Sequence, residues 1–341
     1  MQFSSTRYYS AVIILIFLTT VQAAASDTLY PELKDSFDVS GLGADPDIAV
    51  TEEGEVYIIS SAKPGLWHLQ KKQRIFAPVY IKGVPKDYFF SPSSVESGKD
   101  GELWIANPHM HEILVCSSTG EVLRKFDREN AGLEWPHFLF RSADGKIGAW
   151  DKRQKKIFIF DPVENKVISK KLTVNSSFTC MQDAGGNTLC FDTDNGRVIK
   201  ISGENAVTEA FPKSGTPQIY PKIHHMENGP GNSLFYTDSK HMAYVSADLE
   251  PLGRFLLYEH LFIRLSRFTF QGDHLWLMDE GRQELMHFLV KKAETALEHL
   301  LLGEEYLALG HFAPALEEIL KAESLGQKGA ETDMATGKAY Y

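Results

Sequence analysis

Hydrophobic and polar positions repeat along this chain in one order: a glycine turn, a short apolar strand and a polar break. The order occurs six times between residues 52 and 279. The aligned glycines are Gly54, Gly101, Gly145, Gly186, Gly231 and Gly272, at spacings of 47, 44, 41, 45 and 41 residues. A period in the low forties, with several short strands in each unit, is typical of β-propeller blades.

Each repeat has room for four strands. One apolar strand precedes the glycine, a second follows it, and a third comes next, as in residues 155–162. A turn signal such as Glu164-Asn165 then precedes a fourth strand. Four strands of about 5–6 residues, joined by tight turns, fill about 40 residues. We therefore predict six four-stranded blades.

The two ends of the repeat region complement each other. The last repeat, residues 262–290, contains only three strands, whereas residues 34–41 form an isolated strand ahead of the first repeat. Unpaired strand edges promote aggregation, and pairing these two segments would satisfy both edges. We predict that the N-terminal strand completes the last blade. A loose N-terminal tail is the alternative.

A helical pattern replaces the strand pattern near Lys292. Residues 293–326 carry apolar side chains at helical spacing, with a break at 310–312. Leu302, Gly303, Tyr306, Ala315, Ile319 and Ala322 fall at the offsets of the tetratricopeptide (TPR) pattern. His299 departs from that pattern at its tryptophan position, and Gln327 departs at its closing proline. The segment resembles a TPR repeat, which implies two helices that approach closely at small residues.

The same pattern begins again near the end of the chain. Gly337 and Tyr340 each lie 34 residues after Gly303 and Tyr306. We expect residues 293–341 to hold one full repeat and the start of a second. Because a solenoid needs about three repeats to be stable, we expect these helices to belong to a longer array or to pack on a partner. A capping helix for one docked repeat is the alternative.

The N-terminus resembles an export signal. Arg7 precedes an apolar run at 11–21 and a small-residue segment at 22–25. The run is shorter than the roughly 20 residues that a membrane-spanning helix needs. We predict a signal peptide at 1–25, a propeller at 26–290 and export to the periplasm or the outside of the cell. An uncleaved anchor is the alternative, and the mature chain has no predicted membrane span.

The charge of the chain limits the kinds of partner it can bind, and its cysteines limit the disulfides it can form. With 35 Lys and Arg against 45 Asp and Glu, the formal net charge is −10. No basic cluster accompanies this acidity, which argues against nucleic acid as a partner. Cys180 and Cys190 each lie five residues from Gly185 and could face each other on a hairpin. They form either a disulfide or two buried thiols, and a disulfide would leave Cys116 unpaired.

Polar residues on the strand before each turn are the candidates for a binding site, because that strand lines the central channel of a propeller. They include Asp45, Asp47, Ser94, His137, Thr179, His224, the adjacent His225, and Arg264. Carboxylate, imidazole and guanidinium groups around one channel could bind an anion or a divalent ion. The same groups could instead form a hydrated channel rim.

Motifs for catalysis and metal binding are absent from the sequence. The chain has 12 histidines, but none of their spacings matches a zinc motif. There is no nucleophile elbow, no P-loop and no G-x-G-x-x-G. We predict no cofactor.

Residues 34–290 resemble six-bladed propellers of the NHL type. The resemblance rests on the phrase D/E-G-x-hydrophobic-W/Y, which residues 53–57 and 100–104 match best. In the third repeat, Gly148 stands where the phrase has its aromatic residue. In the fourth repeat, no acidic residue directly precedes Gly186. The wider superfamily includes gluconolactonase-like and streptogramin-lyase-like propellers, which are metal-dependent enzymes. That relation implies a channel site, for which Asp47, His137 and His224 are the matching candidates.

The sequence thus predicts an all-β six-bladed propeller followed by a short all-α TPR hairpin. The predicted function is that of an exported, non-enzymatic scaffold that binds a protein or peptide through the propeller face and the TPR groove. The alternative is a metal-dependent lyase or lactonase with Asp47, His137 and His224 around zinc or calcium. A sensor that binds a small ligand at the channel mouth is a third possibility.

Overall fold

The computed structural model describes most of the chain between Leu29 and Gly326. The described residues are 29–43, 46–85, 91–141, 145–161, 166–174, 178–183, 185–192, 197–202, 206–211, 223–230, 233–237, 242–245, 249, 251–255, 264–308 and 312–326. The predicted signal peptide, the candidate Asp45 and the predicted second TPR segment lie outside them.

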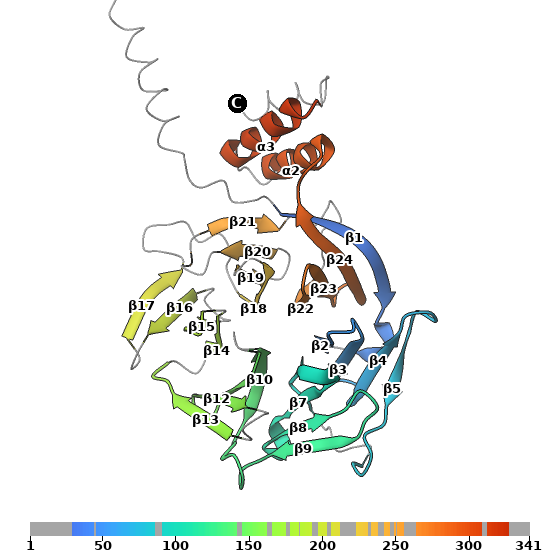
Figure 1. Ribbon diagram of the computed structural model, residues 1–341, viewed down its shortest axis with the longest axis vertical. Coiled ribbons are helices and arrows are strands. Elements are labelled where there is room, and N and C mark those ends of the chain that lie inside the picture. The colour runs from blue at the N-terminus through green and yellow to red at the C-terminus, as the bar shows by residue number, and fades with distance from the viewer. Residues whose placement is uncertain are drawn as a thin grey trace, which may run out of the picture.

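Six four-stranded sheets surround a central axis (Figure 1), as the repeat predicts. Blade one holds β2 (Pro46–Val50), β3 (Val56–Ser60), β4 (Leu66–Gln70) and β5 (Ile75–Val79), and blade two holds β6 (Ser94–Ser97), β7 (Leu103–Asn107), β8 (Glu112–Cys116) and β9 (Val122–Phe126). Blade three holds β10 (Pro136–Arg141), β11 (Ile147–Asp151), β12 (Lys156–Asp161) and β13 (Lys166–Lys171), and blade four holds β14 (Phe178–Gln182), β15 (Thr188–Asp192), β16 (Arg197–Ser202) and β17 (Ala206–Phe211). Blade five holds β18 (His225–Asn228), β19 (Leu234–Thr237), β20 (Met242–Val245) and β21 (Pro251–Phe255), and blade six holds β22 (Leu265–Gln271), β23 (His274–Asp279), β24 (Glu284–Lys292) and β1 (Leu29–Asp38). Short 3₁₀ turns in the described ranges include η1 (Ser40–Leu42), η2 (Lys99–Gly101) and η3 (Pro108–Met110).

The N-terminal strand closes the ring, which confirms the predicted pairing. β1 runs antiparallel to β24, from the pair Leu29 and Lys292 to the pair Asp38 and Glu284. The strand begins at Leu29, five residues before the predicted start at 34. Because β1 supplies the outer strand of blade six, both ends of the propeller chain are tied into one sheet.

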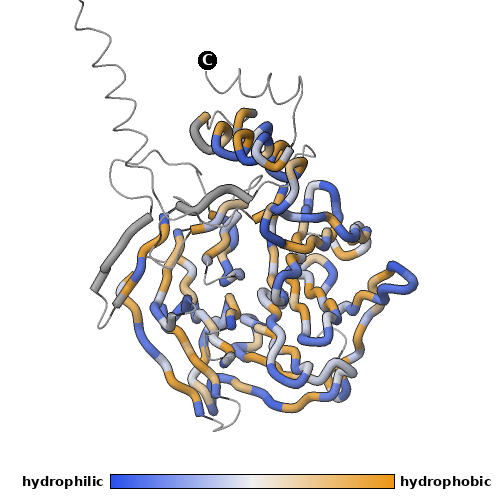
Figure 2. Tube along the Cα trace, turned by 45° about the horizontal axis from the view of Figure 1, so that its top comes forward, coloured by the Kyte–Doolittle hydropathy of each residue, from blue (hydrophilic) through white to orange (hydrophobic). Residues whose placement is uncertain are grey.

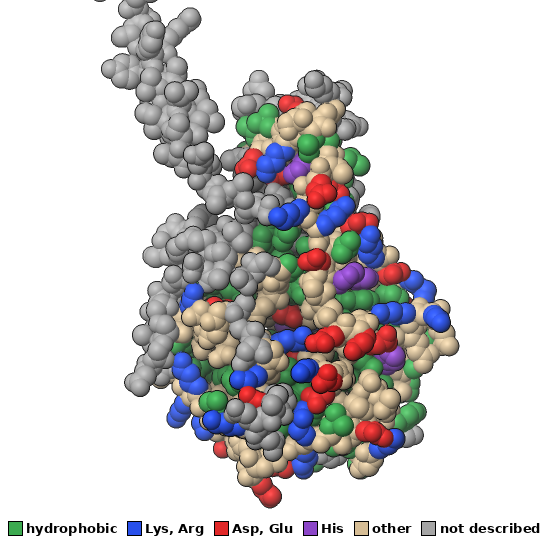
Figure 3. All heavy atoms as spheres, viewed as in Figure 1, with side chains coloured by type: hydrophobic (Ala, Val, Ile, Leu, Met, Phe, Trp, Pro, Cys, Tyr) green, Lys and Arg blue, Asp and Glu red, His purple; other side chains and the backbone are tan. Residues whose placement is uncertain are grey.

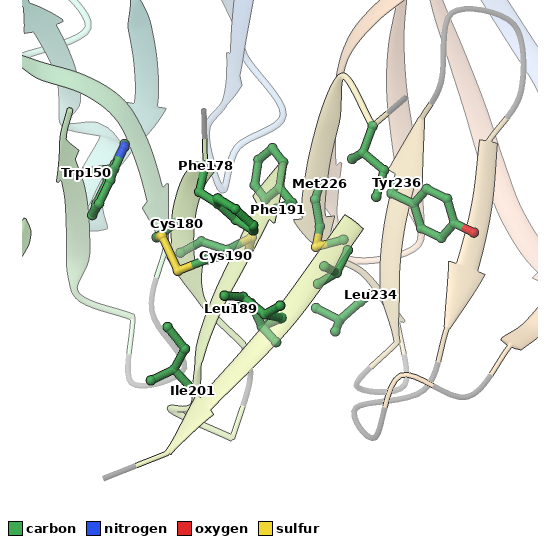
Figure 4. Packing of buried hydrophobic residues seen from close by; sticks show 14 of the residues in the cluster. Trp150, Phe178, Cys180, Leu189, Cys190, Phe191, Ile201, Met226, Leu234 and Tyr236 are labelled. Atoms are coloured by element: carbon green, nitrogen blue, oxygen red, sulfur yellow. A yellow bond between two sulfur atoms is a disulfide. The ribbon is translucent and has the colours of Figure 1, made fainter. Parts of the chain in front are cut away.

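The core lies between neighbouring blades. Every residue of β3, β7, β8, β11 and β15 is buried, because adjacent blades cover both faces of these strands. The outermost strands β9 and β13 are mostly exposed. Hydrophobic residues accordingly follow the inner strands, and hydrophilic residues collect at the turns (Figure 2). Figure 4 shows one such layer, in which Trp150, Phe191 and Met226 come from three successive blades.

A buried polar residue ends the second strand of every blade. These residues are Ser60, Asn107, Asp151, Asp192, Thr237 and Asp279. Asp151 accepts hydrogen bonds from the backbone N–H groups of Glu134 (2.7 Å) and Trp135 (2.8 Å), which lead into the blade. It also accepts from the backbone N–H groups of Arg153 and Gln154 in the next turn. The carboxylate therefore fastens the entry of the blade to its hairpin.

Cys180 and Cys190 are joined by a disulfide, drawn as a yellow bond in Figure 4. They are directly opposite residues of β14 and β15, with Cα atoms 4.1 Å apart. Cys116 is a buried free thiol, and burial raises its pKa to about 12. Its thiolate is therefore scarce at neutral pH, so Cys116 is a poor competitor for disulfide exchange.

Removing this disulfide is expected to destabilise the fold by about 2–3 kcal/mol, since it closes a loop of ten residues. Chemical denaturation of the Cys180→Ser/Cys190→Ser variant measures this change. A reductant should destabilise the native chain by a similar amount and leave the variant unaffected. A reductant that changes neither protein would contradict the disulfide.

Two helices follow the propeller and form a hairpin beside blade six (Figure 1). α2 (Ala296–Ala308) and α3 (Phe312–Ser324) approach each other closely at Gly303. A Cβ atom there would lie 2.5 Å from the side chain of Ile319 and 3.2 Å from the carbonyl oxygen of Ala315. The helical hairpin and its close approach at Gly303 agree with the prediction, whereas the side chain of Tyr306 lies outside the described part. No helix in the described ranges has both the length and the apolar character to cross a bilayer.

Candidate functional site

The innermost strands of the six blades surround a cavity of about 220 Å³. Its charged lining residues are Asp47, Glu96, Arg141 and Glu227, and His225 lies among them. Figure 3 shows acidic and basic side chains gathered around the centre of this face. Four phenylalanines complete the wall: Phe138, Phe140, Phe268 and Phe270. The cavity thus combines carboxylates with aromatic rings.

Asp47 connects three blades at the edge of the cavity. Its Oδ2 accepts a hydrogen bond from the backbone N–H of Val95 at 2.9 Å, and its Oδ1 lies 3.6 Å from Nε of Arg267. Val95 belongs to blade two and Arg267 to blade six. The candidate Asp47 therefore lines the cavity, and its charge is paired with the guanidinium of Arg267.

Glu96 and Arg141 form a second charged pair across blades two and three. Oε1 of Glu96 lies 3.5 Å from Nη2 of Arg141 and accepts from the backbone N–H of Ser97 at 2.9 Å. The same Arg141 nitrogen donates to the carbonyl oxygen of Ser97 at 2.6 Å. Burial raises the pKa of Glu96, and the positive charge of Arg141 opposes that shift.

His225 is held in one tautomer between Arg267 and Phe268. Nη1 of Arg267 donates to Nδ1 of His225 at 3.1 Å, so Nδ1 is the unprotonated nitrogen. Nε2 therefore carries the proton and donates to the carbonyl oxygen of Phe268 at 3.0 Å. Burial and then the charge of Arg267 hold the pKa of His225 well below its usual value. The imidazole is neutral near pH 7.

Glu227 differs from the other two acids because no cationic partner for it occurs among the described residues. Its Oε1 accepts from the hydroxyl of Thr269 at 2.8 Å, and its Oε2 lies 3.6 Å from Nε2 of the neutral His225. Within the described ranges, no Lys or Arg nitrogen lies within 4.0 Å of Glu227. Burial and the nearby charge of Glu96 raise its pKa well above the usual value.

The other predicted candidates lie away from the cavity wall. Ser94 is buried and accepts from the backbone N–H of Leu139 at 3.0 Å, which ties blade two to blade three. Arg264 is exposed and pairs with Glu280 at 3.2 Å. Thr179 is partly buried opposite Phe191 in the β14–β15 ladder.

His137 and His224 also lie outside the cavity wall, unlike His225. His224 is exposed, and its neighbour His225 takes the buried position, because consecutive residues of a strand face opposite sides. His137 is partly buried at the start of β10, and burial lowers its pKa to about 4. Asp47, His137 and His224 therefore do not converge on one cavity. Among the described residues, no group of three or more His, Cys, Asp and Glu side chains is arranged to hold a metal.

Glu96, Arg141 and Glu227 were not among the predicted candidates, whereas His225 was named beside His224 with the two on alternate faces of the strand. The candidates came from the start of each inner strand, and these three residues lie at its turn end. Glu96 is five residues before Gly101, and Arg141 is four residues before Gly145. A polar residue at this offset in an otherwise apolar strand was the available signal.

The helical hairpin carries a second candidate surface. Leu297, Leu320 and Leu325 are between 47% and 57% exposed, and we call them the hairpin leucines. Early α2 residues contact late α3 residues, as Leu300 packs with Ile319 and Ala322. Leu297 and Leu325 therefore lie at the same end of the hairpin. Residues 294–326 contain seven glutamates and one lysine, so the surroundings are acidic.

The fold defines the class: a six-bladed β-propeller with a helical hairpin appended. No protein-family model matches the chain, and no curated protein matches it in sequence. Among solved structures, the fold is similar to virginiamycin B lyase from Staphylococcus aureus, with a TM-score of 0.52 and 16% identity over 71% of this chain and 79% of that chain. It is also similar to a streptogramin B lyase, with a TM-score of 0.50 and 15% identity over 77% of this chain and 98% of that chain. At such identity the likeness shows the fold alone.

Proposed function

We propose that this chain is an exported, non-enzymatic interaction protein in which the propeller is a rigid platform for a TPR-like hairpin. The observation that carries the proposal is the exposure of the hairpin leucines on helices that are anchored to the closing blade. Export rests on the signal-like segment at 1–25. The lyase or lactonase alternative loses support, since its three candidate residues do not meet.

The hairpin is attached to blade six by one ion pair and by one apolar contact. Nζ of Lys291, at the end of β24, lies 2.6 Å from Oε1 of Glu298 in α2. Although burial opposes ionisation, Lys291 and the N–H groups of Glu294 and Thr295 lower the pKa of Glu298 to about 2. Tyr30 of β1 packs against the cluster around Leu302. A fixed hairpin loses less entropy when it binds a partner.

The surface chemistry supports one kind of partner. Exposed leucines fit the apolar face of an amphipathic helix, and the excess of glutamate favours lysine or arginine on its flanks. Glu304 and Glu317 are both exposed beside the helix contact. We therefore assign a basic amphipathic peptide segment as the partner.

A fluorescent peptide of leucine and lysine at helical spacing tests this assignment. The full chain should bind it, and added salt should weaken binding because exposed charges are screened. The Leu297→Asn/Leu325→Asn variant should bind about tenfold more weakly or worse. Leu123→Asn is the matched control, because Leu123 is an equally exposed leucine on β9 of the propeller.

Two outcomes would overturn the proposal. One is equal binding by the hairpin variant and the Leu123→Asn control. The other is equal binding of a peptide in which glutamate replaces every lysine. Melting curves of both variants establish that each is folded, so a loss of binding reports on the surface.

A further inference from the structure

We propose that the central cavity binds a compact organic cation, an ammonium or guanidinium group, with Glu227 as its counter-ion. This site is separate from the hairpin surface and does not depend on the function proposed for it. The inference rests on how charges are distributed around the cavity, on one unpaired amide oxygen and on the aromatic wall.

Among the described residues of the cavity, two of the three acids are paired with a guanidinium and Glu227 is not. Asp47 is paired with Arg267, and Glu96 is paired with Arg141. Glu227 contacts only the hydroxyl of Thr269 and the neutral ring of His225 among the described residues. Its side chain is 22% exposed, so a ligand can reach the carboxylate from the channel. An ionised Glu227 therefore adds one negative charge that no described Lys or Arg side chain pairs with.

Asn228 supplies a second acceptor in the cavity wall. Its Nδ2 donates to the carbonyl oxygen of Gln182 at 3.1 Å, which fixes the orientation of the amide. Its Oδ1 is buried and has no hydrogen-bond partner within the described part of the chain. Buried acceptors are nearly always satisfied in proteins. An N–H group of a bound cation would satisfy this one.

Aromatic rings and size restrict the ligand further. Phe138 and Phe268 stand with their ring edges or faces toward His225, at centroid distances of 5.7 and 4.8 Å. Phenyl faces attract cations, most strongly where water is excluded. A cavity of about 220 Å³ equals about seven water molecules at roughly 30 Å³ each. The ligand is therefore small, with one charged group and a short apolar part.

Ligand binding should be coupled to a proton. In the described part of the chain, Glu96, Asp47, Arg141 and Arg267 are the charged groups that face Glu227 or its neighbours across the cavity. Without a ligand, burial and the two carboxylates favour the protonated form of Glu227, and Arg141 opposes them. A cation selects the ionised form, so binding releases a proton. Affinity should rise with pH through the raised pKa of Glu227 and fall on acidification.

Calorimetric titration with benzylammonium tests the site. Benzyl alcohol and benzoate, which have the same ring with a neutral and an anionic group, are the control ligands. We expect binding of benzylammonium alone, with a measured enthalpy that depends on the buffer because a proton is released. Glu227→Gln should weaken binding about tenfold or more, since the charge-assisted contact is lost. Glu52→Gln is the control, because Glu52 is an exposed acid in a turn and loses the same charge.

Three results would each sink the inference. The first is no binding of benzylammonium to the native chain. The second is comparable binding of benzyl alcohol or benzoate, which would indicate a merely apolar or anionic site. The third is unchanged affinity in Glu227→Gln with a native melting curve.

Discussion

Deletion of residues 29–38 is expected to abolish the cooperative unfolding of the propeller. β1 contributes the outer strand of blade six and pairs with β24 along nearly its whole length. Its loss exposes a long strand edge and opens the ring, and Phe37 leaves the core between blades six and one. Because a domain has a net stability of only about 5–15 kcal/mol, we expect the loss to exceed what the fold can tolerate. Denaturation followed by circular dichroism, with light scattering for aggregation, measures the effect.

Two point variants in the same strand separate the closure from general damage. Phe37 is buried, whereas Leu33 is 54% exposed on the same strand. Phe37→Asp should destabilise the chain by several kcal/mol, about 3–5, and Leu33→Asp should change little. A deletion variant with the same denaturation midpoint as the native chain would contradict a structural role for β1.

The blade count could be predicted because turn chemistry repeats. Gly54, Gly145 and Gly186 all adopt positive φ, a backbone conformation that residues other than glycine rarely adopt. The constraint is local, so it is visible at each repeat in the sequence. The closing strand was predictable for a similar reason, since an isolated strand and a three-stranded blade each have an unsatisfied edge.

The weak third repeat has a structural explanation that the sequence did not reveal. Gly148 occupies the position of Tyr57 and Trp104 in the phrase of blades one and two. Phe140 is its direct cross-strand partner, and a Cβ atom on Gly148 would lie 2.2 Å from the Phe140 ring. The aromatic group is thus supplied by the neighbouring strand. A cross-strand exchange of this kind needs the register, which no local pattern contains.

The cavity residues were harder to predict than the blades. An inner strand has only four to seven residues, so an error of one position exchanges the inward and outward faces. The histidine pair shows this, since His225 is buried and His224 is exposed. Which acid is left without a cation also depends on residues from other blades, as in the pairing of Asp47 with Arg267. Such pairings follow from the closed ring and have no signature in a single repeat.

The second large effect is expected at Asp151, where substitution by asparagine should destabilise the chain by about 3 kcal/mol or more. Its Oδ1 accepts from the N–H groups of Arg153 and Gln154, and its Oδ2 accepts from those of Glu134 and Trp135. Asparagine keeps the shape but replaces one acceptor oxygen with an NH₂ donor, which would face N–H groups in a buried site. Whichever way the amide turns, one end of the blade loses its acceptor.

Asp273→Asn is the matched control, because Asp273 is an exposed aspartate in the turn between β22 and β23. Its substitution should shift the free energy of unfolding by less than about 0.5 kcal/mol. Urea denaturation of the two variants at neutral pH gives the comparison. Equal stability of Asp151→Asn and Asp273→Asn would show that the buried carboxylate does not fasten blade three.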